Sequence, residues 1–145
     1  MSAWTDESGV VVLPDGRRVR GTGQRTARGE VPAPDFAVYL LGRDPEVKGW
    51  PYRRVRWRDF RLPDSPEDAV EALTEAYDRA RDQRVEIACA GGIGRTGTAL
   101  ALLATMSGVP PEDAVTWVRT HYHPRAVETR AQRRWVERTA ASLRR

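Results

Sequence analysis

The sequence predicts an α/β domain with a small, mostly parallel central sheet flanked by helices. Short runs of β-branched and aliphatic residues lie mainly in the first 60 residues, and another precedes Cys89. Segments with apolar residues at helical spacing lie between and after these runs. No repeat or low-complexity linker divides the chain. A length of 145 residues suits one core, so we expect a single domain over residues 1–145.

The first predicted elements form a β-hairpin. The run Val10–Leu13 is followed by the turn sequence Pro14-Asp15-Gly16, and residues 17–20 return as the second strand. Residues 21–34 are rich in glycine, proline and threonine, which predicts a loop. A short buried strand then follows at Phe36–Leu41 and ends before a glycine.

Two further strands are expected. Residues 53–57 alternate in polarity, which places Val55 and Trp57 on one face of a strand. The apolar run Val85–Ala88 is the other, and it comes directly before Cys89. The strands lie early and centrally in the chain, with helices to cover them.

The first predicted helix begins after Ser65. Ser65 is a suitable N-cap, Pro66 suits the first helical position, and acidic residues occupy the first turn. Its apolar residues recur at the spacing of one helical face: Ala69, Val70, Leu73, Ala76, Tyr77 and Ala80. Thr98–Met106 is almost wholly apolar, which predicts a buried helix that ends at Gly108.

The C-terminal part contains two more predicted helices. One opens at Pro110 or Pro111 and runs through Val118. The last is amphipathic and begins after Thr129. Thr129 and Gln132, three residues later, match the capping-box pattern of a helix start.

A glycine-rich loop between the strand at 85–88 and the buried helix is the most informative segment. Cys89 is followed by five residues, three of them glycine, and then by Arg95. Glycines allow successive backbone N–H groups to converge, and the helix N-terminus adds partial positive charge. Because Arg95 can bind two oxygens through its fork, the loop predicts a site for a phosphate-like dianion.

The same positive field acts on the thiol of Cys89. A free thiol has a pKa of about 8.5, and helix N-termini and neighbouring cations lower it to roughly 3.5–7.5. The hydroxyl of Thr96 is placed to donate to the sulfur and stabilise it as a leaving group. Cys89 is therefore the candidate nucleophile. With one cysteine in the chain no internal disulfide is possible, and we expect a cytoplasmic protein.

The segment CAGGIGRTG at 89–97 resembles the signature loop of the protein tyrosine phosphatase superfamily, C-x-x-G-x-G-R-[ST]-G. This resemblance implies that Cys89 is the nucleophile and that backbone and side-chain donors of the loop bind phosphate. The implied phosphate-binding residues are Ala90, Gly91, Gly92, Ile93, Gly94 and Arg95. The family usually has histidine directly before the cysteine, and here that position is Ala88, which bears on how strongly the thiol is activated.

A second resemblance lies upstream, in Trp57-Arg58-Asp59-Phe60-Arg61-Leu62-Pro63. It is similar to the family's mobile acid loop, W-P-D-x-G-x-P, with arginine in place of the usual proline and glycine. The resemblance implies that Asp59 is the general acid of the first step and the general base of the second, with Asp64 as the alternative.

Near the C-terminus, residues 124–132 resemble a segment of compact dual-specificity members that ends in a glutamine near the phosphate. Gln132 is accordingly a candidate for orienting the hydrolytic water, a role compatible with its place in the capping box. The resemblance runs from Trp57 to Gln132, and the first fifty residues are not assigned.

No cofactor is expected, because arginine and the helix end supply the positive charge. His121 and His123 lack partners at ligand spacing, so we expect no metal. Lys48 is the single lysine among 24 basic residues, and the arginines are interspersed with acids, which argues against a dedicated nucleic-acid surface. No run is apolar enough to predict a membrane partner.

The sequence thus predicts a phosphatase that acts on phosphorylated proteins, with phosphotyrosine as first choice and phosphoserine or phosphothreonine as further substrates. Ala90 and Ile93 stand where phosphoinositide phosphatases of the family tend to have lysines, which disfavours inositol lipids. An RNA 5′-phosphatase stays open. So does a catalytically weak pseudophosphatase that binds phosphoproteins. An arsenate reductase or sulfurtransferase relative is disfavoured by the acid loop.

Overall fold

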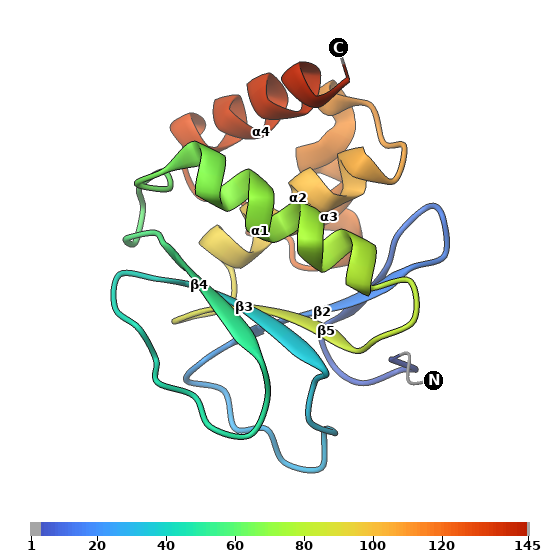
Figure 1. Ribbon diagram of the computed structural model, residues 1–145. Coiled ribbons are helices and arrows are strands. Elements are labelled where there is room, and N and C mark those ends of the chain that lie inside the picture. Colours follow the sequence, from blue (N-terminus) through green and yellow to red (C-terminus); the bar gives the residue numbers. More distant parts are fainter. Residues whose placement is uncertain (1–3, 145) are drawn as a thin grey trace.

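Within the residues that the structure describes, a five-stranded sheet with four α-helices on one side forms the framework of the domain (Figure 1). The computed structural model describes residues 4–144. The strands are β1 (Val10–Val12), β2 (Arg18–Gly23), β3 (Phe36–Leu41), β4 (Tyr52–Arg56) and β5 (Val85–Cys89). The helices are α1 (Pro66–Arg79), α2 (Gly94–Met106), α3 (Ala114–His121) and α4 (Arg130–Leu143), with a 3₁₀ turn, η1, at Pro111–Asp113.

The sheet has the order β1-β2-β5-β3-β4. The hairpin pair β1–β2 is antiparallel, and the other three pairs are parallel. The predicted α/β class with a mostly parallel sheet is therefore confirmed. The strand β5, which ends at Cys89, lies at the centre between β2 and β3, so the carboxyl ends of three parallel strands meet near the thiol.

The strand β2 is longer than the sequence predicts. Gly21–Gly23 was expected in a loop, but these residues pair with Ile87, Ala88 and Cys89 of β5. Glycine has low strand propensity, and here it is required by close neighbours. A Cβ atom on Gly23 would lie 2.7 Å from the carbonyl carbon of Gly91 in the phosphate loop.

The helices form two layers above the sheet. The helices α1 and α2 contact the strands, and α3 and α4 pack against α2 (Figure 1). The predicted caps are present: Ser65 Oγ accepts the Asp68 N–H at 3.2 Å, and Thr129 and Gln132 form the capping box of α4. The helix predicted from Pro110 or Pro111 begins as η1 and continues as α3.

The buried helix α2 begins at Gly94, four residues before the predicted start at Thr98. The glycines of this turn hide the helix start in the sequence, but close packing explains Gly97, because a Cβ there would overlap Ala126. The consequence is that the N-terminus of α2 lies directly at the end of the phosphate loop.

The opposite face of the sheet is covered by connecting segments instead of helices. Side chains of Val47 and Trp50 pack against Tyr39 and Ala88 on that face. Glu86 is buried there, and its carboxylate binds Arg20 at 2.6 Å and Arg28 at 2.5 Å. This ion-pair triad fixes the segment after β2 to the sheet.

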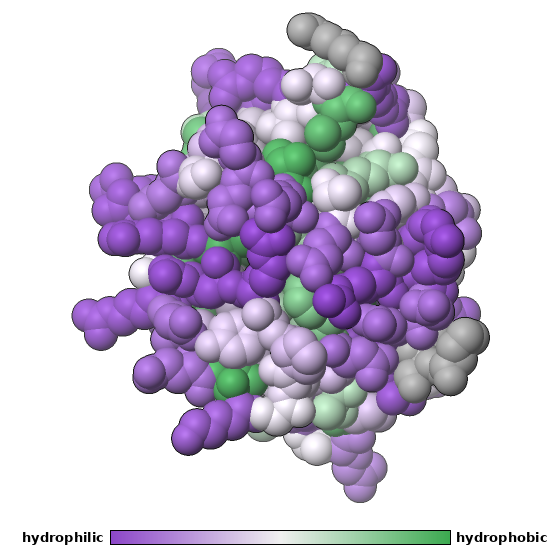
Figure 2. Space-filling model, in the orientation of Figure 1, coloured by the Kyte–Doolittle hydropathy of each residue, from purple (hydrophilic) through white to green (hydrophobic). Residues whose placement is uncertain are grey.

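The surface in the view of Figure 2 is mostly hydrophilic, with a hydrophobic area between α1 and α4. None of the helices in residues 4–144 combines the length and the apolar character that crossing a lipid bilayer would require.

Candidate active site

The loop after β5 wraps around the sulfur of Cys89. Gly92 has φ +77°, a left-handed conformation that favours glycine, and its N–H donates to the Cys89 sulfur at 3.1 Å. A side chain at Gly92 would overlap the backbone of Gly23. The loop therefore depends on glycine both for its backbone turn and for its contact with β2.

Cys89 is 2% exposed and lies at a cavity of about 110 Å³. The cavity is lined by Arg25, Asp59, Phe60, Cys89, Ala90, Gly91, Ile93, Gly94, Arg95 and Glu128. Five of the six residues expected to bind phosphate are in this set. Gly92 is the exception, since it lies on the outer side of the loop and contacts the sulfur through its amide.

Arg95 is 6% exposed and is held by the backbone of two other segments. Its Nη1 donates to the carbonyls of Leu40, at 3.0 Å, and Trp57, at 2.9 Å. Its Nε is buried and has no hydrogen-bond partner within residues 4–144, and its Nη2 lies 3.7 Å from Asp59. One edge of the guanidinium fork is thus anchored by hydrogen bonds, and the Nε–Nη2 edge makes none within residues 4–144 and can bind two oxygens.

Asp59 lies at the mouth of the cavity, with its side chain 58% exposed. Its Oδ1 accepts the N–H of Phe60, at 3.0 Å, and Phe60 has φ +60°. The acid loop is closed on itself by a hydrogen bond from Trp57 Nε1 to the carbonyl of Arg61, at 2.7 Å. The ring of Trp57 also packs edge-on against Trp135 of α4, with centroids 5.4 Å apart.

The alternative acid, Asp64, is engaged elsewhere. It pairs with Arg56 at 3.1 Å and with Arg58 at 3.7 Å, and it is not among the residues that line the cavity. Of the two predicted acids, Asp59 therefore lines the cavity and Asp64 does not.

Thr96 is fully buried directly after Arg95. Its hydroxyl donates to the carbonyl of Thr22 at 3.4 Å, so the hydrogen bond to the sulfur comes from the Gly92 amide in this structure. A hydrogen bond between Thr96 and Cys89 stays a prediction.

Gln132 is fully buried, and its side chain forms hydrogen bonds with the surrounding backbone. Its Oε1 accepts the N–H groups of Glu128, at 2.9 Å, and Thr129, at 3.2 Å, and its Nε2 donates to the carbonyl of Arg61 at 3.3 Å. It does not line the cavity. Its side chain instead ties the segment before α4 to the acid loop.

Glu128 is a cavity residue that the sequence reasoning missed. Its carboxylate lies against Gly94 at the N-terminus of α2, so closely that a Cβ on Gly94 would overlap it. The sequence did contain an indication of this, because Glu128 belongs to the same segment as Gln132, which was expected near the phosphate.

Arg25 and Phe60 were also missed. The segment after β2 reaches the loop through backbone hydrogen bonds, from Gln24 N–H to the Cys89 carbonyl at 2.7 Å and from Arg25 N–H to the Ala90 carbonyl at 3.2 Å. Phe60 is 61% exposed beside Asp59. No local pattern marks Arg25, because the contact joins residues more than sixty positions apart.

The two histidines lie outside this cavity. The ring of His121 stacks on Trp117, with centroids 4.2 Å apart, and His123 Nδ1 accepts the Arg125 N–H at 3.0 Å. Residues 4–144 contain no group of three or more His, Cys, Asp or Glu side chains that are suitably placed to hold a metal.

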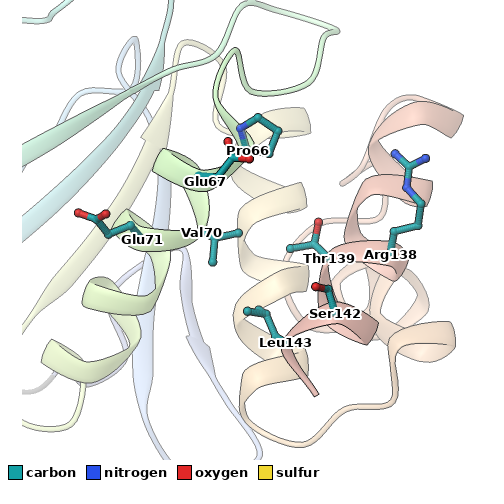
Figure 3. A pocket seen from close by; sticks show the side chains of 8 residues that line it. All are labelled: Pro66, Glu67, Val70, Glu71, Arg138, Thr139, Ser142 and Leu143. Carbon is teal, nitrogen blue, oxygen red and sulfur yellow. The ribbon is translucent and has the colours of Figure 1, made fainter. Parts of the chain in front are cut away.

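A wider groove of about 470 Å³ lies between α1 and α4 (Figure 3). Val70 of α1 faces Thr139 and Leu143 of α4 across it, whereas Arg138 points away. The groove contains no residue of the phosphate loop or the acid loop. Size alone therefore does not identify the reactive site.

The fold and the site together are those of a phosphatase-type α/β domain. Its features are a central parallel strand that ends in a thiol, a glycine loop, an anchored arginine and a buried helix. The protein-tyrosine phosphatase family model matches residues 15–141. The chain belongs to this family. The match also covers the parallel strands β2, β3 and β4, so the family relationship extends beyond the segment from Trp57 to Gln132 on which the resemblance was noticed.

The chain is also similar to individual proteins and solved structures. Two uncharacterized proteins of Methanocaldococcus jannaschii are 38% and 42% identical over 60 residues, which is 41% of this chain and 36% and 40% of theirs. The chain thus spans less than half the length of the curated relatives it matches. The structure of Tk-PTP in its active form is 27% identical with a TM-score of 0.70, over 90% of this chain and 96% of that one. Kinase associated phosphatase shares the fold, at 20% identity and a TM-score of 0.63, over 76% and 70%.

Proposed function

We propose that this chain, as one domain, hydrolyses phosphate monoesters on proteins through a phosphocysteine intermediate on Cys89. The observation that carries the proposal is that a buried thiol shares a cavity of about 110 Å³ with Arg95, whose Nε–Nη2 edge makes no hydrogen bond within residues 4–144. An arginine edge held in place before the substrate arrives costs no reorganisation when charge develops on the phosphoryl oxygens.

In the first step the Cys89 thiolate attacks phosphorus, the S–P bond forms and the P–O bond to the alcohol breaks. The leaving oxygen takes its proton from Asp59, which lines the same cavity. The Arg95 fork and the loop amides bind the phosphoryl oxygens that lie between the attacking sulfur and the leaving oxygen.

In the second step water attacks phosphorus and the S–P bond breaks. Asp59 accepts the proton from water, inorganic phosphate leaves, and the thiolate is restored. We assign the holding of that water to Glu128, the second carboxylate of the cavity, in place of Gln132. Gln132 supports this role indirectly, because it binds the backbone N–H of Glu128.

Phosphotyrosine remains the first choice of substrate. The exposed ring of Phe60 at the cavity mouth offers an aromatic surface to a phenyl ring, and Arg25 offers positive charge to an acidic peptide. Dual specificity toward phosphoserine and phosphothreonine is part of the same proposal. A nucleophilic thiolate requires reducing conditions, which supports a cytoplasmic location.

The test is steady-state hydrolysis of p-nitrophenyl phosphate and of a phosphotyrosine peptide by the wild type and by Cys89→Ser, with excess chelator present. We expect chelator-resistant turnover by the wild type and none by the variant. Since Arg95 and the loop amides provide the positive charge, strong inhibition by the chelator would refute the metal-independent mechanism. Vanadate binding without any turnover by folded wild type would favour the phosphoprotein-binding alternative.

A further inference from the structure

Tyr122 makes a contact with the phosphate loop that the mechanism above does not use. It caps the C-terminus of α3, and its hydroxyl donates a hydrogen bond to the carbonyl of Gly92. The two residues are far apart in the sequence, so the contact depends on the packing of α3 beside α2. A side chain outside the loop therefore holds the loop's backbone.

The position of this hydrogen bond determines which way one amide group points. A trans peptide is planar, with its carbonyl and N–H on opposite sides. The carbonyl of Gly92 shares its peptide with the N–H of Ile93, and Ile93 lines the phosphate cavity. Holding the carbonyl outward on Tyr122 therefore directs the Ile93 N–H inward, where a phosphoryl oxygen would bind.

The loop itself resists rotation of this peptide poorly. Gly91, Gly92 and Gly94 lack side chains that would fix the backbone, and glycine adopts both signs of φ readily. Ala88, the residue before Cys89, has only a methyl side chain, which cannot form a hydrogen bond with the loop. The contact with Tyr122 is thus well placed to decide between loop conformations.

The strand β2 is shaped to receive the phenol. A Cβ atom on Gly21 would lie 2.6 Å from the ring of Tyr122 and 2.8 Å from its oxygen. Gly21 does not have a positive φ, so its backbone would tolerate alanine. Its lack of a side chain therefore serves the close packing of Tyr122.

The phenol stays a donor over the working pH range of an enzyme. Burial raises the pKa of Tyr122 well above its usual value, and the negative charge of Cys89 raises the pKa further. The hydroxyl accordingly keeps its proton at neutral and at alkaline pH.

We infer that Tyr122 is a positioning residue, which holds the peptide between Gly92 and Ile93 in the orientation that binds phosphate. The inference rests on the proposed phosphatase function. Tyr122 does not touch the reacting atoms. It sets the fraction of molecules whose loop is ready to bind, and apparent affinity scales with that fraction.

The experiment compares the wild type with Tyr122→Phe in the hydrolysis of p-nitrophenyl phosphate and in inhibition by orthovanadate. Loss of one hydrogen bond should raise KM and the vanadate inhibition constant together, by about 2- to 10-fold, with little change in kcat. Gly21→Ala, which displaces the phenol, should give the same change. The double variant should be no worse than either single variant.

Tyr77→Phe is the matched control, because its hydroxyl bonds Asp15 at the hairpin turn and not the loop. KM and the vanadate constant of Tyr122→Phe equal to those of the wild type and of Tyr77→Phe would overturn the inference. So would a fall in kcat at unchanged KM, which indicates a smaller folded fraction. Absence of turnover by the wild type would instead refute the proposed function.

Discussion

The substitution Arg95→Lys separates the shape of the arginine from its charge. In the structure Nη1 is bound by the carbonyls of Leu40 and Trp57, and Nε and Nη2 remain for the substrate. Lysine keeps one positive charge but has a single ammonium group. It cannot reach both carbonyls and at the same time bind two phosphoryl oxygens in a fixed geometry.

The expected loss follows from the number of hydrogen bonds removed. Two hydrogen bonds between a charged donor and phosphoryl oxygens, at about 1.5–3 kcal/mol each, amount to about 3–6 kcal/mol in the transition state. At about 1.4 kcal/mol per tenfold change in rate, kcat/KM should fall roughly 10²- to 10⁴-fold. Because the ammonium retains the charge, the lower part of this range is expected.

The assay is kcat/KM for p-nitrophenyl phosphate, with thermal unfolding measured in parallel to show that the variant folds. Arg53→Lys is the matched control, since Arg53 pairs with Asp68 and Glu75 of α1, and none of the three lines the cavity. A folded Arg95→Lys enzyme with kcat/KM within about 3-fold of the control would refute the fork argument.

Three further predictions concern other side chains. Asp59→Asn should lower kcat by roughly 10²- to 10⁴-fold on a phosphotyrosine peptide. The loss should be smaller on p-nitrophenyl phosphate, whose leaving group needs the proton less. Asp64→Asn should have little effect, and an equal loss of kcat in both variants would contradict the assignment of Asp59. Glu128→Ala should slow the second step and give a burst of p-nitrophenol in stopped flow, and a linear trace with wild-type kcat would count against it. Asp15 is partly buried, which raises its pKa, but the hydrogen bond from Tyr77 and other contacts lower the pKa more. The charged Asp15 side chain therefore stabilises the fold above its unfolded-state pKa of about 3.9, and this stabilisation is lost as the pH falls through the lower folded-state pKa. The difference in Tm between the wild type and Asp15→Asn should accordingly shrink below about pH 4. A Tm difference that stays constant with pH would be evidence against this.

The sequence was most informative where structure is local. The strand before Cys89, the glycine loop, Arg95 and the helix behind it are contiguous, so their spacing alone predicts a phosphate site. The caps at Ser65 and Thr129 were predictable for the same reason, since a cap acts within one turn.

Prediction was weaker where a residue's role depends on tertiary contacts. The glycines of β2 predict a loop from the sequence, yet Gly21 and Gly23 pair with β5 as part of a strand. These positions are glycine because Tyr122 and the phosphate loop leave no room for side chains there. The segment at 124–132 indicated a residue near the phosphate, but only the packing of α4 shows that Glu128 faces the cavity and that Gln132 binds backbone.

The central claim is that the phosphoryl group is transferred to the sulfur of Cys89 before water releases it. The most direct measurement mixes enzyme with a phosphotyrosine peptide, quenches within milliseconds in alkaline denaturant and locates the phosphoryl group by mass spectrometry of the digested chain. We predict a phosphoryl group on the peptide that contains Cys89, absent in Cys89→Ser. A phosphoryl group on another residue, or turnover that persists in Cys89→Ser, would contradict the mechanism.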